Sequence, residues 1–297
     1  MISAALFNSI SQSLIQKGLI ATPLIRQFPI SGGSINQSYR IESSNEAFFV
    51  KINQKEKLPY LFEKEERGLQ LLRSKSELKV PKPLVVGYFE SHSYLVMELI
   101  ETGSPKVKFW ENFATGLAHL HQCSANEFGL EENNYVGSLI QENGKEKDWT
   151  TFFIENRLKV QLNLANENKR LDKSINDSFV LLFDRMSGIF PEEPPALLHG
   201  DLWSGNFLCN KEGQAVIMDP AVYFGHREMD LAMTHLFGGF DSKFYKAYES
   251  VFPLADGWQH RIDLCNLYPL LVHVNLFGAA YANRLKSVLK QILKNTL

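Results

Sequence analysis

Three side chains that carry oxygen ligands, Asp201, Asn206 and Asp219, occur within one short stretch of the sequence. Asp201 and Asn206 belong to the run HGDLWSGN at residues 199–206, and Asp219 follows Asn206 by thirteen residues. A carboxylate can accept the proton of an attacking hydroxyl group, and carboxylate and amide oxygens are ligands for Mg²⁺. Phosphoryl transfer needs both functions. We therefore interpret Asp201 as a candidate catalytic base and Asn206 and Asp219 as candidate metal ligands.

The spacing Asp-Leu-x-x-x-Asn is also that of the catalytic loop of kinases. Asp219 follows a short apolar strand, Ala215 to Met218, as the metal-binding Asp of kinases does, although a Pro-Ala pair replaces the usual Phe-Gly. The alternative is that Asp201 and Asn206 only stabilise a turn, because short polar side chains bond their own backbone. That alternative loses weight because the other parts of a phosphoryl-transfer site occur upstream in the expected order.

A lysine and a glutamate that could hold the phosphates of a nucleotide occur earlier in the chain. Lys51 ends the apolar strand Ala47 to Lys51, where kinases place the cation that binds the α- and β-phosphates. A lysine on a flexible stem needs a carboxylate to orient it. We predict that Glu65 is this carboxylate, since it shares a helix face with Leu69, and Glu63 is the second choice.

Two more segments of this region are candidates for contact with a nucleotide. The first comprises Gly32, Gly33 and Ser34. Glycines there let backbone N–H groups approach a phosphate, although a Gly-Gly pair between strands is more often a hairpin turn. The second comprises Met97, Glu98, Leu99 and Ile100, at the end of a predicted strand. Exposed backbone groups of Glu98 and Ile100 could pair with an adenine, and an ordinary edge strand is the alternative.

The elements that must position these residues fall into two regions. Short β-branched or aromatic runs separated by turn residues predict strands in the first region, and an apolar repeat of four residues predicts an initial helix capped by Ser3. The predicted strands are Ile25–Ile30, Ser38–Ile41, Ala47–Ile52, Leu84–Phe89 and Tyr94–Leu99, with a helix at Pro59–Arg73. Helical periods then dominate, at Phe109–His121, Trp149–Asn163, Ile175–Ile189 and beyond Arg227. We predict an α+β fold with two lobes, residues 1–102 with an antiparallel sheet and one main helix, and residues 103–297, mostly helical.

Length and composition agree with a folded protein of two lobes. The chain has 297 residues, of which 44% are hydrophobic and 22% charged, values typical of globular proteins. Lys and Arg total 31 against 33 for Asp and Glu, so no large positive field favours nucleic acid or an anionic membrane as a partner. Three distant cysteines argue against a disulfide framework. The pattern contains no signal peptide or membrane-spanning segment, so we expect a cytoplasmic protein. We also expect a monomer or at most a weak homodimer.

Together these residues resemble the fructosamine kinase family, within a wider group of aminoglycoside-phosphotransferase-like and choline-kinase-like enzymes. The HGDLxxxN core is shared by the wider group, whereas other stretches resemble fructosamine and ketoamine kinases in particular. These are Gly32-Gly33 with residues 35–40, Trp203, residues 219–221, residues 223–228 with 236–240, residues 134–137 with 141–143 and 148–149, and residues 267–281. The resemblance covers nearly the whole chain.

The resemblance implies a bilobal, protein-kinase-like fold in which Asp201 is the base and Lys51, Asn206 and Asp219 bind ATP and Mg²⁺. It implies transfer of the γ-phosphate of ATP to the sugar 3-hydroxyl of a ketoamine, on a small molecule or a protein lysine. The phosphorylated product then decomposes and frees the amine. Ser34 stands where many members carry a cysteine, so we expect no thiol-based control through that position.

Contacts to the acceptor substrate are the least specified part of the prediction. Trp203, beside the base, could stack on a sugar, and Trp149, His226 and Glu228 are candidates for the rim, although such aromatic residues more often serve packing. Asp230 is expected to accept backbone N–H groups of the catalytic loop. Two alternatives remain open: a phosphotransferase of the aminoglycoside or choline kinase type, and a catalytically silent nucleotide-binding module.

Overall fold

The computed structural model describes residues 1–31 and 35–295, which divide into two units. The first unit contains Met1–Ser74, Leu78–Val107 and Leu208–Asp219, and the second contains Lys75–Glu77, Lys108–Phe207 and Pro220–Leu297. The candidate glycines Gly32 and Gly33 and the neighbouring Ser34 lie outside the described residues. Within the described part of the chain, no helix combines the length and the apolar character needed to cross a membrane.

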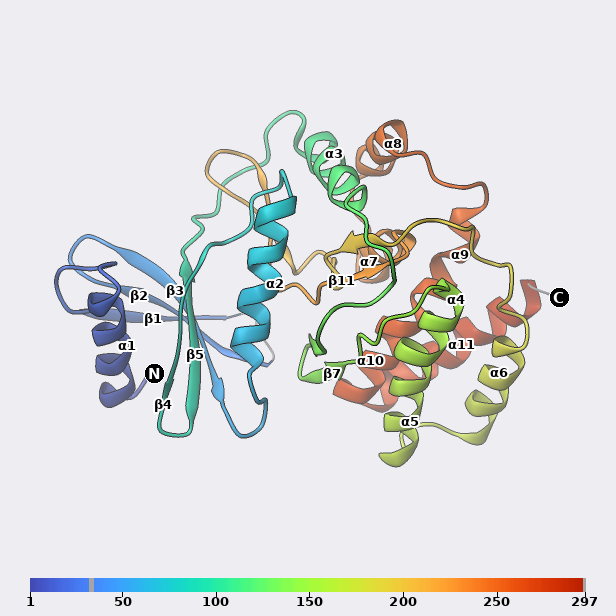
Figure 1. Ribbon diagram of the computed structural model, residues 1–297, viewed down its shortest axis with the longest axis horizontal. Coiled ribbons are helices and arrows are strands. Elements are labelled where there is room, and N and C mark those ends of the chain that lie inside the picture. Colours follow the sequence, from blue (N-terminus) through green and yellow to red (C-terminus); the bar gives the residue numbers. More distant parts are fainter. Residues whose placement is uncertain (32–34, 296–297) are drawn as a thin grey trace. The chain divides into compact units, whose positions relative to one another are not determined.

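The first unit is built on a five-stranded antiparallel sheet with the strand order β1-β2-β3-β5-β4. The strands are β1 (Arg26–Ile30), β2 (Gln37–Glu42), β3 (Ala47–Gln54), β4 (Pro83–Phe89) and β5 (His92–Glu98). Helices α1 (Ala4–Gln16) and α2 (Leu61–Lys75) cover opposite faces of this sheet (Figure 1). Each of the five predicted strands agrees with an observed strand to within two residues at either end.

Side-chain alternation along β3 decides which residues face which helix. Phe48, Val50 and Ile52 belong to the same apolar cluster as the buried face of α1. Because successive side chains of a strand point to opposite faces, Lys51 points to the face covered by α2. Helix α1 begins after Ser3, whose side-chain oxygen accepts a hydrogen bond from the N–H of Leu6 at 3.3 Å, as the sequence predicted.

The segment Leu208–Asp219 pairs with chain from the N-terminal region. The N–H of Gly103 donates to the carbonyl of Cys209 at 2.9 Å, and the N–H of Ile217 donates to the carbonyl of Lys79 at 3.0 Å. Strand β10 (Ala215–Ile217) also pairs with β9 (Phe207–Cys209). The predicted boundary after residue 102 places this segment in the C-terminal lobe. The structure instead groups it with the first unit, because these hydrogen bonds join it to the N-terminal region.

The second unit is mostly helical. Its helices are α3 (Phe109–His121), α4 (Trp149–Phe152), α5 (Val160–Glu167), α6 (Lys173–Phe183), α7 (Glu228–Leu236), α8 (Ser242–Val251), α9 (Trp258–Cys265), α10 (Leu267–Phe277) and α11 (Ala279–Asn295), and a π-helix, Phe153–Lys159, joins α4 to α5. Two short antiparallel pairs complete it: β6 (Asn134–Val136) with β7 (Leu139–Gln141), and β8 (Ala196–Leu198) with β11 (Tyr223–Gly225). The π-helix and the β6–β7 pair were not predicted from the sequence.

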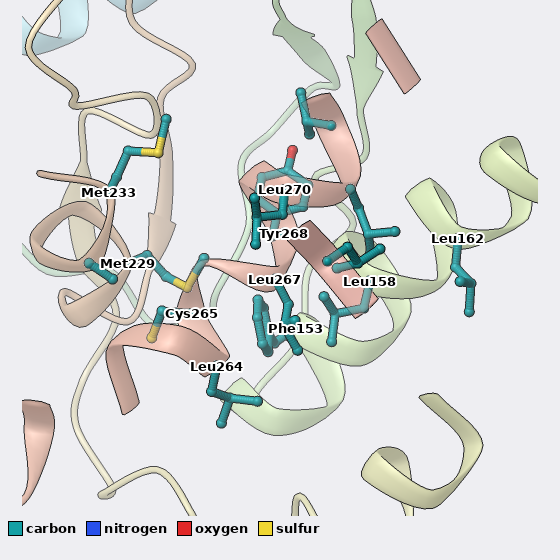
Figure 2. Packing of buried hydrophobic residues seen from close by; sticks show 14 of the residues in the cluster. Phe153, Leu158, Leu162, Met229, Met233, Leu264, Cys265, Leu267, Tyr268 and Leu270 are labelled. Atoms are coloured by element: carbon teal, nitrogen blue, oxygen red, sulfur yellow. The ribbon is translucent and has the colours of Figure 1, made fainter. Parts of the chain in front are cut away.

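One apolar cluster holds these helices together. Phe153 and Leu158 from the π-helix pack with Leu267 and Leu270 of α10, and Figure 2 also shows Met229 of α7 in this cluster. Burying one such side chain stabilises the fold by about 1.5–3 kcal/mol. The cluster therefore fixes α7 and α10, the two helices that supply most of the pocket described below.

Candidate active site

In the first unit, Lys51 lies between two carboxylates. Its Nζ is 2.5 Å from Oε1 of Glu65 and 2.6 Å from Oδ1 of Asp219. The side chains of Lys51 and Glu65 are 5% and 10% exposed, whereas that of Asp219 is 45% exposed. Asp219 has a φ of 57°, a left-handed backbone conformation that is uncommon for a residue other than glycine and is often found at functional sites.

The two carboxylates determine the charge state of this lysine. Burial lowers the pKa of Lys51, but the negative charges of Asp219 and Glu65 and the hydrogen bonds to them outweigh burial, so the pKa lies above its usual value. Lys51 is therefore charged at neutral pH. Burial and the charge of Asp219 outweigh the effect of Lys51 and raise the pKa of Glu65 above its usual value. When both carboxylates are ionised, one ammonium group facing them leaves an excess negative charge, which a bound cation could compensate.

The choice of Glu65 over Glu63 as the partner of Lys51 agrees with the geometry. Both glutamates lie in α2, but Glu63 accepts a hydrogen bond from the hydroxyl of Tyr88 instead. Glu65 stands four residues before Leu69, which is 1% exposed, so the two share the face of α2 that is turned to the sheet.

In the second unit, Asp201 is held by its own loop. The amide Nδ2 of Asn206 donates to the backbone carbonyl of Asp201 and to its carboxylate Oδ2, both at 2.8 Å. Gly200, immediately before Asp201, has a φ of 82°, and any side chain at this position would collide with the carbonyl of Ala221. The loop therefore needs glycine at residue 200, and this close packing limits how far Asp201 can move.

Asp230 braces the same loop, as the sequence predicted. Its carboxylate accepts the N–H of His199 at 2.7 Å and the N–H of Gly200 at 2.9 Å, and Nε2 of His121 lies 3.2 Å from it. Burial raises the pKa of Asp230, but the hydrogen bonds from His121 and from the loop outweigh burial, so its pKa lies below the usual value. Asp230 therefore stays ionised and holds the backbone that precedes Asp201.

A pocket of the second unit opens beside Asp201. Its wall combines apolar, aromatic and a few polar side chains from β6, β11, α7 and α10. The lining residues are Val136, Gly200, Asp201, Tyr223, Met229, Asp230, Met233, Tyr268, Pro269, Val272 and His273. Of these residues, only Asp201 was predicted from the sequence as a site residue. Tyr223, Tyr268 and His273 lie in the runs 223–228 and 267–281 that resemble the family, but the resemblance assigned them no role, and Met229 and Met233 lie outside these runs.

The residues predicted to contact the acceptor do not line this pocket. Trp149 is 5% exposed, His226 is fully buried, and Glu228 is 2% exposed and pairs with Arg261 through two hydrogen bonds of 2.6 and 2.8 Å. A rim residue needs exposed surface, so we leave these three out of the proposed substrate contacts. Trp203 is half-buried, and its ring contacts that of Phe237 at a centroid distance of 5.6 Å.

The segment proposed to contact the adenine lies at the end of β5, and one of its two candidate backbone N–H groups is already bonded within the protein. Met97 is buried, whereas Glu98, Leu99 and Ile100 are half-buried. The N–H of Glu98 donates to the carbonyl of Lys82 at 2.9 Å, which removes one of the predicted backbone groups. The N–H of Ile100 remains the candidate donor.

Comparison with solved structures identifies the class of fold. An aminoglycoside phosphotransferase, APH(4)-Ia, solved as a ternary complex with ADP and hygromycin B, matches with a TM-score of 0.64 at 17% identity, over 96% of this chain and 98% of the other. The fold is therefore that of the protein-kinase-like phosphotransferases, with an antiparallel-sheet lobe and a helical lobe, as the sequence predicted.

A sequence profile of the fructosamine kinase family matches residues 6–295, and this chain belongs to that family. A protein from Enterococcus faecium named as a probable ketoamine kinase is 40% identical, over 88% of this chain and 93% of its own. The protein-ribulosamine 3-kinase, chloroplastic, of Arabidopsis thaliana is 36% identical, over 92% and 84%. A crystal structure from Haemophilus somnus, assigned as a fructosamine-3-kinase, has a TM-score of 0.85 at 28% identity, covering 96% of both chains.

Proposed function

We propose that this protein is an ATP-dependent kinase that phosphorylates the sugar 3-hydroxyl of ketoamines, the adducts that form between sugars and amines. The observation that carries the proposal is the loop around Asp201, a residue that lines a pocket, while Asn206 and Asp230 hold the loop in place. Membership of the fructosamine kinase family supports the choice of acceptor.

Asp201 has the chemistry of the base in this reaction. It takes the proton of the 3-hydroxyl as the sugar oxygen forms a bond to the γ-phosphorus of ATP, and the bond to the bridging oxygen breaks to release ADP. The amide of Asn206 donates to Oδ2 of Asp201, which orients the carboxylate for this step. The phosphate then sits on the carbon next to the ketone carbonyl and is a good leaving group, so the product decomposes and the free amine is restored.

Lys51 is the proposed ligand of the nucleotide phosphates, with Glu65 orienting it at 2.5 Å. Backbone groups of the segment Met97 to Ile100 are the proposed contacts of the adenine, and the segment Gly32 to Ser34 is the proposed contact of the phosphates. A cation that is charged at neutral pH and held by a buried carboxylate meets the requirement for binding a polyphosphate.

Asn206 and Asp219 fit the proposed role of Mg²⁺ ligands. Asn206 uses its amide nitrogen to bind Asp201, so its oxygen is the atom that can serve a metal. Asp219 is partly exposed and shares Lys51 with Glu65, so negative charge remains to attract a cation. In the described part of the chain no three His, Cys, Asp or Glu side chains cluster around a metal position. Mg²⁺ needs only one or two protein oxygens when phosphates complete its shell, and the ion would neutralise charge on the transferred group.

A panel of synthetic acceptors tests the proposal. Ribulose-lysine, erythrulose-lysine and fructose-lysine, each with ATP and Mg²⁺, are assayed by coupled ADP release and by phosphate incorporation into the sugar. We expect turnover with at least one of them and none with lysine alone. ADP release without transfer to any ketoamine, or transfer to hygromycin B or choline instead, would overturn the proposal.

A further inference from the structure

Three buried amide side chains in the second unit form a hydrogen-bonded network with no assigned role. Asn134, Gln141 and Asn143 are 6%, 1% and 1% exposed. Oδ1 of Asn134 accepts a hydrogen bond from Nε2 of Gln141 and another from Nδ2 of Asn143, both at 2.9 Å. A fully bonded polar network inside a protein rigidifies its surroundings, because every alternative arrangement leaves a buried polar group unpaired.

Arg157 in the π-helix anchors this network at one end. Its Nη2 donates to Oδ1 of Asn143 at 2.8 Å, and its guanidinium lies 4.0 Å from the ring centroid of Tyr223 and 4.6 Å from that of Phe152. Arg157 is fully buried, and no carboxylate in the described part of the chain pairs with it. The Nη groups of Arg157 therefore donate to amide and carbonyl oxygens and the guanidinium lies against aromatic rings, while its buried Nε has no hydrogen-bond partner in the described part of the chain. These contacts tie the position of Asn143 to the core.

The other end of the network reaches the backbone behind the catalytic loop. Nε2 of Gln141 donates its second hydrogen to the carbonyl of Ala221 at 2.9 Å. The N–H of Ala221 in turn donates to the carbonyl of His199 at 2.9 Å, and the same residue packs directly against Gly200. The amide of Gln141 is thus two contacts away from Gly200, the residue that precedes Asp201.

Gln141 also holds one wall of the pocket. The hydroxyl of Tyr268 donates to Oε1 of Gln141 at 2.8 Å, and Tyr268 lines the pocket together with Asp201. Tyr268 is 3% exposed and belongs to the apolar cluster of Figure 2, so this hydrogen bond is the polar constraint on an otherwise apolar side chain. The side chain of Gln141 therefore constrains both Ala221, which supports the loop of Asp201, and Tyr268, which forms a wall of the pocket.

From this connectivity we propose that Gln141 is a positioning residue, which sets the catalytic loop through Ala221 and the acceptor pocket through Tyr268. The role in turnover rests on the function proposed above. Gln141 does not touch the reacting atoms. Its contribution is geometric, and a displacement of about 1 Å at a catalytic group can reduce turnover about 100-fold.

Three variants separate positioning from stability. Gln141→Met removes all hydrogen bonds of the amide at similar volume, and Tyr268→Phe removes only the bond to the pocket wall. Gln161→Met is the matched control, because Gln161 is also 1% exposed in the second unit but its amide oxygen accepts from Asn275, outside the pocket. Each is compared with the wild-type full chain for Tm, kcat, and KM for ATP and for the ketoamine.

We expect Gln141→Met to lower kcat about 10- to 100-fold, with the KM for ATP within twofold of wild type. Tyr268→Phe should raise the KM for the ketoamine about two- to tenfold, the worth of one hydrogen bond, with kcat nearly unchanged. Gln161→Met should lower Tm without either kinetic change. The proposal is overturned if Gln141→Met lowers Tm but leaves kcat and both KM values at wild type, or if Gln161→Met lowers kcat equally.

Amide hydrogen exchange provides a readout that does not depend on the substrate. In Gln141→Met we expect faster exchange at the N–H groups of His199, Gly200 and Ala221, and in Gln161→Met no change at these groups. If the wild type turns over no ketoamine, the proposed function fails, and the exchange comparison still decides whether Gln141 holds the loop. If Gln141→Met does not fold, the hydrogen exchange and kinetics of Tyr268→Phe test the part of the proposal that concerns the pocket. Exchange rates and KM values equal to those of the wild type would overturn that part.

Discussion

Asp201 is the residue whose loss should affect turnover most. In Asp201→Asn the side chain keeps its size but cannot accept the proton of the acceptor hydroxyl, so we expect kcat to fall about 10²- to 10⁴-fold. The affinity for ATP, measured by calorimetry, should remain within about twofold, because the proposed phosphate ligand Lys51 is unchanged. Asp184→Asn, an exposed residue at the end of α6, is the control and should behave as wild type. Turnover near wild type in Asp201→Asn would exclude its role as the base.

The ion pair between Lys51 and Glu65 leads to a second prediction at this scale. Glu65→Gln removes the charge of a carboxylate that lies 2.5 Å from Lys51, and a hydrogen bond to a charged group is worth about 1.5–3 kcal/mol. Because Lys51 loses its orientation, we expect the KM for ATP to rise about 10- to 100-fold with a smaller effect on the KM for the ketoamine. Glu63→Gln, two residues earlier on α2, should leave both unchanged. Equal effects of the two variants would contradict the pairing.

Among the elements, α7 has the most direct connection to the catalytic loop, through Asp230. In Asp230→Asn one oxygen becomes an NH₂ group facing the N–H groups of His199 and Gly200, so the loop loses an acceptor in a buried site. We expect a loss of stability of about 1–3 kcal/mol, measured by denaturant unfolding, together with a fall in kcat. Thr234→Val on the same helix removes a buried hydroxyl that bonds to Leu231 and Tyr245, and should lower stability while leaving kcat unchanged. A stable, fully active Asp230→Asn would contradict the bracing role.

Sequence patterns located most of the elements but missed the π-helix at Phe153–Lys159. The periodic apolar residues predicted one helix over Trp149–Asn163, and a helical path is present from Trp149 to Glu167. The change of hydrogen-bonding pattern inside it coincides with Arg157, which is buried among the rings of Phe152 and Tyr223. Local propensity cannot reveal this, because the distant partners of Arg157 come from α10 and β11 and from the turn after β7.

For the whole molecule, buried titratable groups predict a loss of stability in acid. Burial lowers the pKa of His226 below its usual value, so between pH 6.5 and the folded pKa the unfolded chain binds a proton that the folded chain does not. Burial raises the pKa of Glu193, but the hydrogen bonds from Arg227 and nearby positive charges outweigh it and lower the pKa, so its contribution is lost below about pH 4.5. Both contributions therefore decrease as the pH falls.

We expect the free energy of unfolding to fall from pH 7 to pH 4, measured by urea denaturation at constant salt. Each unit by which a folded pKa lies below its unfolded value contributes about 1.4 kcal/mol. His226→Gln should flatten the curve just below pH 6.5, and Glu193→Gln should flatten it below pH 4.5. A wild-type curve that rises toward acid, or slopes unchanged in both variants, would contradict these assignments.

The sequence by itself predicted most of the elements and the candidate chemistry of the site. Alternation placed Lys51 on the opposite face of β3 from Val50, and helical spacing selected Glu65 as its partner, because strand and helix periods are local properties of the backbone. The run His199 to Asn206 indicated a candidate base, Asp201, and its amide neighbour, Asn206, because the two residues are close together in the chain. These inferences depend on residues close together in the chain.

Only the tertiary structure decided which distant residues support the loop of Asp201 and line the pocket beside it. Gln141, Tyr268 and Ala221 meet through hydrogen bonds that span up to 127 residues of chain, and no period in the sequence encodes such pairs. His226 and Glu228 are buried, so the prediction that they lie at the rim of the substrate site is not supported. Whether a polar side chain faces solvent or a buried partner depends on the residues that pack against it, which the sequence pattern does not reveal. Long-range packing, rather than local preference, therefore determined which residues line the pocket beside Asp201.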